Sequence, residues 1–360
     1  MANEARDEPS PTASRVHFGG PGSADFALRD LLAARIADAP PGSAIDVVTY
    51  YLRDRRLARD LAAARARGVD VRVTLEARPR RADANAAVAA LLAAPEGDGG
   101  IGARFRALAH APLVPGTRLR ARLHAKLYVF SRPDAAFLGS FNPSGDAPEL
   151  APDVVAEIGD HDRGYNALVE LRDPALVAAL RDHARGVAAG AHGRLERCAR
   201  AQRARVASGD TELAFWPRAA RHPLLALLRA LGRGDAARVV ASHVSGRHGP
   251  GALARAARRG ARVELLSHAN ERRFPRATEA ALRAAGVAVA RVGSEVARPM
   301  HDKFALVDRA GERCVAFGSF NLNAQSIWLN HEVGAVSRER GLVLAFEGRW
   351  RALRAAAGLQ

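Results

Sequence analysis

The chain is poor in cysteine and aromatic residues and has no long apolar run. Only Cys198 and Cys314 occur among its 360 residues, which excludes a disulfide framework and makes a reducing compartment natural. No stretch approaches the ~20 apolar residues needed to span a bilayer. The polar residues 1–15 lack the apolar core of a signal peptide, and we expect them to be disordered. These absences predict a cytoplasmic protein.

Positive charge is abundant. The chain carries 54 Lys and Arg residues and a net charge of +16. Such an excess favours anionic partners, including nucleic acid, acidic phospholipid and other phosphate esters, without choosing among them. It is equally consistent with a coding bias toward Arg, in which the side chains only solvate helix faces.

Alternating strand and helix patterns occur twice along the chain. Strands are predicted at 45–51, 69–75, 237–242 and 261–266, and helices at 28–36, 57–67 and 253–259. The junctions read ARARGVDVRVTL and RAARRGARVELL, with Gly68 and Gly260 ending the helix in each. This internal duplication predicts an α/β fold of two similar domains, each with a mixed or parallel sheet flanked by helices.

The predicted domains are residues 16–195 and 196–360. A helix over 173–185 begins the connection between them. Its N-cap is Asp173, followed by a proline at the first helical position, and Gly186 marks its end.

Each repeat carries a His-x-Lys sequence followed by Gly-Ser-x-Asn. The first pair is His124 and Lys126, and the second is His301 and Lys303. Residues i and i+2 of a strand point to the same face, so each His projects together with its Lys. The second motif comprises Gly139, Ser140 and Asn142 in one repeat, and Gly318, Ser319 and Asn321 in the other. The glycines are expected to permit a tight turn and a close approach to a ligand.

These residue types suit a phosphodiester. Lys neutralises phosphate oxygens and Asn adds a hydrogen-bond donor. One His can attack phosphorus covalently, while a second protonates the leaving oxygen and later activates the acceptor. Because each repeat supplies one His, the reaction needs both halves in one active site.

An acid follows each Gly-Ser-x-Asn at equal spacing. Asp153 lies eleven residues after Asn142, and Glu332 lies eleven residues after Asn321. A nucleophilic His needs a partner that holds its tautomer. We therefore interpret Asp153 and Glu332 as the orienting carboxylates.

Taken together, the motifs resemble the phospholipase D superfamily over most of the chain. The second motif matches in full, with Asp308 five residues after its Lys. The first has Ser131 at that position, and Asp134 lies three residues further on as a possible replacement. The resemblance implies two α/β domains with the active site at their interface, a phosphohistidine intermediate, and neither metal nor other cofactor. It also implies His124 as nucleophile and His301 as general acid and base, although the two roles can be exchanged without changing the sequence argument.

Two further pairs of residues follow strands. His243 and His248 are interpreted either as ligand-loop residues or as solvated loop residues, and Tyr50 and Tyr51 as packing residues rather than pocket lining.

Three functions are compatible with these patterns. The first is hydrolysis or exchange of a phospholipid head group, as in cardiolipin synthase-like members, acting peripherally on the anionic inner membrane surface. The second is a nuclease, supported by the charge of +16, although aromatic residues for base stacking are few. The third is a catalytically inactive binding protein, for which Ser131 is the one indication. Under the first two, a monomer suffices for the active site.

Overall fold

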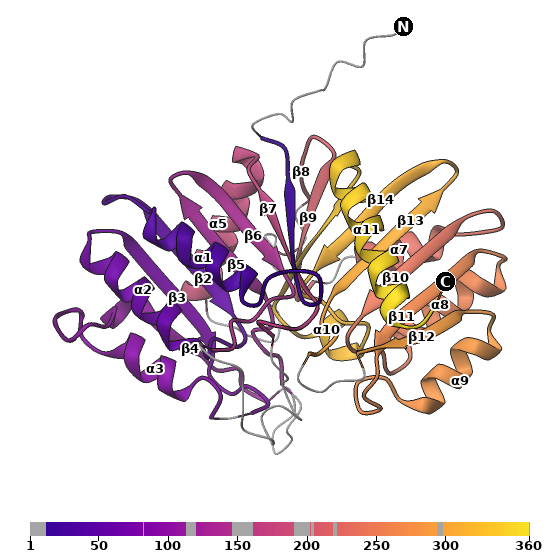
Figure 1. The fold of residues 1–360 in the computed structure, drawn as a ribbon, viewed down its shortest axis with the longest axis horizontal. Helices are drawn as coiled ribbons and strands as arrows, with labels where there is room; N and C mark the ends of the chain where they lie inside the picture. The colour runs from indigo at the N-terminus through magenta and orange to yellow at the C-terminus, as the bar shows by residue number, and fades with distance from the viewer. Residues whose placement is uncertain are drawn as a thin grey trace, which may run out of the picture.

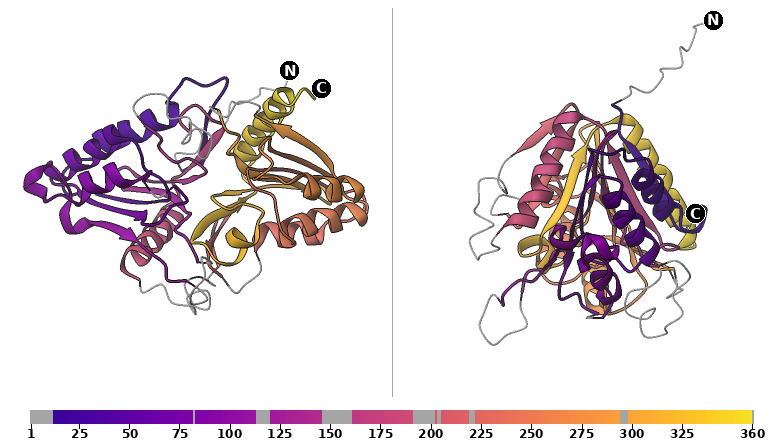
Figure 2. Two further views of the ribbon diagram at one scale, coloured as in Figure 1. Left: turned by 90° about the horizontal axis from the view of Figure 1, so that it is seen from below. Right: turned by 90° about the vertical axis from the view of Figure 1, so that its left-hand side faces the viewer.

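The computed structural model describes residues 12–81, 83–112, 120–145, 161–190, 202, 205–218, 222–293 and 298–359. Two mixed β-sheets lie side by side, one in each half of the chain, with helices against them (Figures 1 and 2). We refer to the described residues up to 190 as the first half and to those from 202 onward as the second half.

The sheet of the first half has the order β1-β7-β6-β5-β2-β3-β4. Its strands are β1 (Arg15–Gly19), β2 (Ala44–Thr49), β3 (Asp70–Glu76), β4 (Phe105–Leu108), β5 (Lys126–Ser131), β6 (Asp134–Gly139) and β7 (Asn166–Leu171). Strands β2, β3 and β4 are parallel neighbours, and the remaining pairings are antiparallel.

The sheet of the second half repeats this order as β12-β11-β10-β13-β14-β15-β9 and adds β8 at its edge. Its strands are β8 (Val206–Ser208), β9 (Thr211–Trp216), β10 (Ala236–Ala241), β11 (Arg262–His268), β12 (Ala288–Val292), β13 (Lys303–Arg309), β14 (Glu312–Gly318) and β15 (Glu332–Ser337). Each half therefore places its Lys at the start of a central strand, β5 or β13. The predicted duplicated α/β fold is confirmed.

The helices follow the same repeat. One face of the first sheet packs against α1 (Ala27–Ala37), α2 (Arg55–Ala66) and α3 (Ala86–Ala93), and the corresponding face of the second packs against α7 (Pro223–Ala230), α8 (His248–Arg258) and α9 (Arg276–Ala284). The opposite faces are covered by α5 (Pro174–Ala189) and α11 (Arg340–Ala356), which share one apolar cluster. The short helices η1 (Glu96–Asp98), η2 (Gly102–Arg104) and α10 (Ala324–Trp328) complete the described fold.

Local sequence signals account for several helix ends. Asp54 accepts the backbone N–H of Leu57 at 2.9 Å and caps α2, and Asp173 caps α5 as predicted. Gly68 and Gly260 adopt φ values of +94° and +92°, which a residue with a Cβ rarely adopts. The prediction for Gly186 was wrong, because α5 continues through it to Ala189.

The last helix of each half packs against a strand of the other half, and these contacts join the two halves. His183 of α5 stacks on Phe215 of β9 with ring centroids 4.2 Å apart, and Phe346 of α11 meets Phe18 of β1 at 5.5 Å. Each half thus lays its last helix against a strand of the other. Because the central apolar cluster draws residues from both halves, the sheets are held in one fixed relation. Among the described helices, none is long and apolar enough to cross a membrane.

Candidate active site

Both His-x-Lys strands enter the boundary between the halves by pairing with the opposite half. Leu123 forms a parallel bridge with His331, and the backbone N–H of His124 donates to the carbonyl of His331 at 2.8 Å. In the same way, Met300 bridges Tyr165, and the N–H of His301 donates to the carbonyl of Tyr165 at 2.9 Å. Each histidine is therefore held beside the first residue of the other half's β7 or β15.

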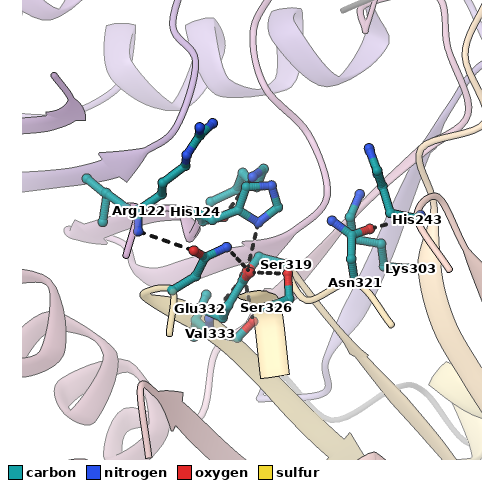
Figure 3. Close-up of polar contacts among 12 residues, drawn as sticks. Arg122, His124, His243, Lys303, Ser319, Asn321, Ser326, Glu332 and Val333 are labelled. Carbon is teal, nitrogen blue, oxygen red and sulfur yellow. Dashed lines mark hydrogen bonds and ion pairs between the residues drawn. The ribbon is translucent and has the colours of Figure 1, made fainter. Parts of the chain in front are cut away.

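This crossed pairing gives His124 a carboxylate partner from the second half. Its Nδ1 lies 2.9 Å from Oε2 of Glu332, which is fully buried (Figure 3). The other donors to this carboxylate are Ser319 Oγ at 2.5 Å, Ser326 Oγ at 2.7 Å and Asn330 Nδ2 at 3.2 Å. With four contacts, the acceptor sites of the carboxylate are filled. Glu332 accordingly holds the proton of His124 on Nδ1 and leaves the lone pair of Nε2 available.

His301 has an amide partner in the equivalent place. Its Nδ1 lies 3.1 Å from Oδ1 of Asn166, the first residue of β7. The amide is oriented, because Nδ2 of Asn166 donates to the carbonyl of His161 at 2.9 Å. Ser140 Oγ donates to the same Oδ1 at 3.1 Å, as Ser319 does to Glu332. Asn166 therefore holds the proton of His301 on Nδ1 without adding a negative charge.

The partner of His301 does not lie eleven residues after Asn142, the spacing that separates Glu332 from Asn321. Asp153 lies outside the described residues, and the side chain that contacts His301 is Asn166. In the second half, β14 ends at Gly318 and β15 begins at Glu332, whereas in the first half β6 ends at Gly139 and β7 begins only at Asn166. The longer connection displaces the equivalent position along the chain. The sequence contained no signal that singled out Asn166.

Each lysine is buried beside its histidine. Nζ of Lys126 donates to the carbonyl of His124 at 2.7 Å, and Nζ of Lys303 donates to the carbonyl of His301 at 2.8 Å. Burial lowers the pKa of Lys126 to about 7, although the charge of Glu332 opposes the shift. Burial also lowers the pKa of Lys303 well below its ordinary value, and the charge of Lys126 adds to this effect. The charge of Lys126, in the first half, thus acts on Lys303 in the second, which places both half-sites in one electrostatic environment.

Burial keeps both histidines in the neutral form at neutral pH. Burial lowers the pKa of His124 to about 4 despite the opposing charge of Glu332. Burial, reinforced by the charge of Lys303, brings the pKa of His301 well below its ordinary range. Burial alone would raise the pKa of Glu332. Its contact with His124, the charge of Lys126 and the hydrogen bond from Ser319 lower that pKa instead, so Glu332 stays ionised.

The two motif asparagines occupy equivalent positions. Oδ1 of Asn142 accepts the backbone N–H of Tyr51 at 3.4 Å, and Oδ1 of Asn321 accepts that of His243 at 3.2 Å (Figure 3). The second residue after the end of β2 or β10 thus orients each amide, and the amide NH₂ is left for other partners. Both asparagines line the site cavity.

A third histidine, His161, stands beside the second half-site. Its ring centroid lies 4.1 Å from that of His301, and its Nδ1 lies 3.2 Å from Nδ2 of Asn142. Because Oδ1 of Asn142 accepts from Tyr51, its Nδ2 must be the donor, and His161 carries its own proton on Nε2. No local signal in the sequence marked this residue, because it belongs to no repeated motif.

A cavity of about 430 Å³ opens above these residues. Four arginines and four histidines contribute to its wall: Arg80, Arg122, Arg272, Arg273, His124, His161, His243 and His301. Tyr50 and Tyr51 also line it, although each is only 6% exposed, so they both pack and line the pocket. His243 takes part, whereas His248 is exposed and contacts Trp328. No group of three or more His, Cys, Asp or Glu residues in the described part of the chain could hold a metal ion.

The motif glycines permit close strand pairing. A Cβ on Gly139 would lie 2.1 Å from the carbonyl oxygen of Ala167, and one on Gly318 would lie 2.4 Å from that of Val333. The glycines therefore allow β7 and β15 to pair closely beside the site, and the expected approach of a ligand to them stays a prediction.

The position where the motif aspartate differs lies away from the histidines. Ser131 ends β5, about 17 Å of extended chain from Lys126. Its Oγ accepts the backbone N–H of Ala44 at 2.7 Å. Asp134, the first residue of β6, contacts Arg181 of α5 at 2.5 Å. Asp308, near the end of β13, lies opposite Ala236 of β10. Asp134 therefore does not bring a carboxylate into the active site.

Comparison with known proteins agrees with this geometry. The family model described as "Cardiolipin synthase, PLD-like domain" matches residues 32–182 and 229–353, one segment in each half. No curated protein matches the chain.

Two solved structures share the architecture. Phosphatidylserine synthase from Haemophilus influenzae Rd KW20 aligns with a TM-score of 0.64 and 14% identity, over 95% of this chain and 86% of that one. Polyphosphate kinase from Porphyromonas gingivalis aligns with a TM-score of 0.60 and 13% identity, over 94% of this chain. The chain spans only 50% of that kinase. At these identities the likeness concerns the fold.

Proposed function

The chain belongs to the family of cardiolipin synthase, phospholipase D-like domains, and we propose that it cleaves or exchanges a phosphodiester through a covalent phosphohistidine. The observation that carries this proposal is the pair of oriented imidazoles at one cavity. Nδ1 of His124 contacts Glu332, and Nδ1 of His301 contacts Asn166, so that in both rings Nε2 is the nitrogen without the orienting contact.

We assign the nucleophile to His124. In the first step its Nε2 attacks phosphorus, the bond from phosphorus to the leaving oxygen breaks, and that oxygen takes the proton from Nε2 of protonated His301. Glu332 supports this role, because its carboxylate offsets the positive charge that His124 acquires on forming the P–N bond. Lys126 and Lys303, with Asn142 and Asn321, then stabilise the charge on the phosphoryl oxygens.

In the second step the acceptor attacks the phosphohistidine. Neutral His301 takes the proton of water or an alcohol, the acceptor oxygen bonds to phosphorus, and the P–N bond to His124 breaks. The lowered pKa leaves Nε2 of His301 without a proton in the absence of substrate, so the anionic substrate must raise this pKa on binding. The neutral Asn166 is compatible with both tasks of His301, since it fixes the ring without fixing a charge.

The experiment is to trap the intermediate. Bis(p-nitrophenyl) phosphate has a leaving group that needs no protonation, so His301→Ala is expected to release about one equivalent of p-nitrophenol and stop. Mass spectrometry of the quenched protein should then locate an acid-labile adduct on His124. Retention of full turnover by His124→Ala would overturn the mechanism, and absence of turnover in the wild type would support the inactive binding protein. An adduct on His301 in the matched His124→Ala variant, with none on His124 in His301→Ala, would exchange the two roles.

For the substrate we propose a phospholipid phosphodiester first, because the matching family model is described as cardiolipin synthase. A nuclease is the second candidate, supported by the net charge of +16 and by the four arginines of the cavity wall. Incubation with phosphatidylglycerol vesicles, and in parallel with plasmid and single-stranded DNA, separates the two. Each reaction contains EDTA and is matched with His124→Ala. Phosphatidic acid or cardiolipin formed only by the wild type supports the lipid enzyme, and DNA cleavage alone overturns it.

A further inference from the structure

His161 of the first half contacts the second-half histidine in two ways. Its imidazole ring packs against that of His301, with ring centroids 4.1 Å apart and planes tilted by 41°. Its backbone carbonyl accepts Nδ2 of Asn166 at 2.9 Å, and Oδ1 of the same amide is the partner of Nδ1 of His301 at 3.1 Å. His161 therefore acts on His301 directly through its ring and indirectly through the amide that orients His301.

Three hydrogen bonds hold residues 161–162 against the turn that follows the first Gly-Ser-x-Asn. The backbone N–H of His161 donates to Ser144 Oγ at 2.9 Å. Asp162 accepts the backbone N–H groups of Ser144 and Gly145 at 2.8 and 3.0 Å. The His161 side chain is only 3% exposed, yet it lines the site cavity. The ring is thus a fixed part of the cavity wall.

The two half-sites differ in the aromatic ring beside the histidine. Strands β2 and β10 have the same register against β5 and β13, so Tyr50 and Ser242 are equivalent positions. The Tyr50 ring lies 5.2 Å from that of His124. At the equivalent place the second half has a serine, and the ring beside His301 is His161, from the opposite half. His161 is therefore not a product of the duplication but an addition to one half-site.

The hydrogen bonds of the two rings determine which of them accepts a proton. Nδ2 of Asn142 donates to Nδ1 of His161, and this amide is kept from flipping because its Oδ1 accepts the backbone N–H of Tyr51. A proton on Nδ1 of His161 would set two donors against each other in a buried place. His301 meets no such conflict, since its Nδ1 donates to Asn166 and the added proton enters at Nε2. The first proton that the pair takes up therefore belongs to His301.

The surrounding charges oppose a second proton on the pair. Burial lowers the pKa of His161 and that of His301 well below their ordinary values. The positive groups that add to this effect at one or both rings are Arg53, Lys126, Arg273 and Lys303. The carboxylates of the same region have other partners: Asp162 in the turn, Asp302 at Arg349 and Glu332 at His124. Because two imidazolium rings in contact would also repel each other, the pair holds one proton at most.

We propose that His161 is a positioning residue for His301, a ring that stays neutral and whose π system stabilises the protonated form of His301. An aromatic ring attracts a neighbouring cation, and the attraction is larger where water is excluded. The inference rests on the proposed function for the acid and base role of His301. In the first step the proton passes from His301 to the leaving oxygen, and in the second His301 takes the proton of the acceptor. His161 exchanges no proton in either step.

Two substrates separate the acid role of His301 from the effect of the lysines. In the first step diphenyl phosphate releases phenol, which needs a proton, whereas bis(p-nitrophenyl) phosphate releases a group that does not. The lysines act on both substrates, so the ratio of the two single-turnover rates reports on His301 alone. This ratio falls as the pH rises through the pKa of His301 in the complex.

Replacement of His161 should move that fall. His161→Leu fills the space without an aromatic ring and lowers the pKa of His301, so the ratio should begin to fall about one pH unit earlier than in the wild type. His161→Phe keeps a neutral ring and should restore the wild-type ratio to within about twofold. The matched control is His248→Leu, because His248 is exposed and does not line the cavity. An unchanged profile in His161→Leu, or a His161→Phe variant as impaired as His161→Leu, would overturn the inference.

Nitrogen-15 NMR of labelled histidines locates the protons without turnover. Dimethyl phosphate is the probe, and His161→Phe and His301→Ala identify the two rings. We expect His161 to carry its proton on Nε2 with and without the probe, and His301 to gain a second proton when the probe binds. A doubly protonated His161 would overturn the inference. If the wild type turns over neither substrate while these protons lie as expected, the proposed reaction fails and the assignment of His161 stands.

Discussion

The two half-sites share a repeated set of lysine, serine and asparagine but differ in the residue that orients each histidine. The lysines and serines make equivalent contacts in both halves, and each motif asparagine accepts a backbone N–H from the matching loop. The exception is the residue that opens β15 or β7, which is Glu332 beside His124 and Asn166 beside His301. A carboxylate stabilises a histidine that becomes positively charged, whereas an amide only fixes its tautomer. The duplication thus supplies two equivalent histidines. We expect the residue that contacts each of them, Glu332 or Asn166, to decide which acts as nucleophile and which as general acid and base.

We expect the largest effect on activity when the carboxylate partner of His124 is replaced with an amide, the kind of partner that His301 has. Glu332→Gln is close to isosteric, but its amide NH₂ would replace one carboxylate oxygen and face the two donors that this oxygen accepts. Placed toward His124 and Ser319, it would favour the His124 tautomer with the proton on Nε2. We expect kcat to fall about 10³-fold, since a wrong tautomer removes the nucleophilic lone pair. Steady-state kinetics with bis(p-nitrophenyl) phosphate measures the loss.

The control for this variant is Glu312→Gln, a change at an exposed residue of the β13–β14 hairpin. Thermal unfolding of both variants separates a folded, inactive enzyme from an unfolded one. A loss of less than tenfold in folded Glu332→Gln would contradict the nucleophilic role of His124.

A smaller effect is expected from the reverse change. Asn166→Asp places a carboxylate beside His301, which raises the pKa of that histidine because the opposite charge favours its protonated form. Protonated His301 remains a competent acid but becomes a poor base, so the second step should slow about tenfold and the phosphohistidine should accumulate. Quenched-flow measurement of the adduct checks this. An unchanged adduct level with unchanged kcat would remove the distinction between the two partners.

The pH dependence compares the two lysines. Lys126 has a pKa of about 7 and loses its proton as the pH rises through that value, although the charge of Glu332 opposes the loss. The pKa of Lys303 lies well below its ordinary value, because this lysine is buried and the charge of Lys126 acts on it. We expect kcat/KM to decline above pH 7, approaching tenfold per unit. A bound phosphodiester favours the protonated lysine, so the alkaline limb of kcat should lie at higher pH than that of kcat/KM. A profile in which both limbs coincide would contradict the assignment.

We expect the smallest effect on activity at Ser131, which occupies the position of Asp308 in the second motif. Ser131→Asp restores the family residue at the end of β5, remote from the histidines, and should change kcat/KM less than twofold. Ser131→Ala removes the acceptor for the backbone N–H of Ala44 and should lower the free energy of unfolding by about 1 kcal/mol. Denaturant unfolding and steady-state kinetics test both. A tenfold change in kcat from either variant would give this position a catalytic role.

Much of the candidate site followed from the sequence. The i, i+2 spacing of His124 and Lys126 on a strand, and its recurrence at His301 and Lys303, predicted which side chains project together. The glycine-ended helices and the repeated junctions predicted two similar α/β units. These inferences depend on local geometry, which a strand or a helix end carries wherever it is placed.

Other residues of the site needed the fold. Asn166 and His161 carry no local pattern that marks them, and the equal spacing that led to Glu332 led in the first half to Asp153, which lies outside the described residues. The connection between β6 and β7 is longer than that between β14 and β15, so position along the chain ceased to indicate position in space.

What the sequence by itself determined is therefore the inventory of the site: two imidazoles, two ammonium groups and two amides, each set on a predictable strand and turn. The tertiary structure alone decided which residues act on one another. The crossed pairing of Leu123 with His331 and of Met300 with Tyr165 gives each histidine a partner from the opposite half. Such pairings are set by the packing of two sheets around a shared core, and no local spacing encodes them.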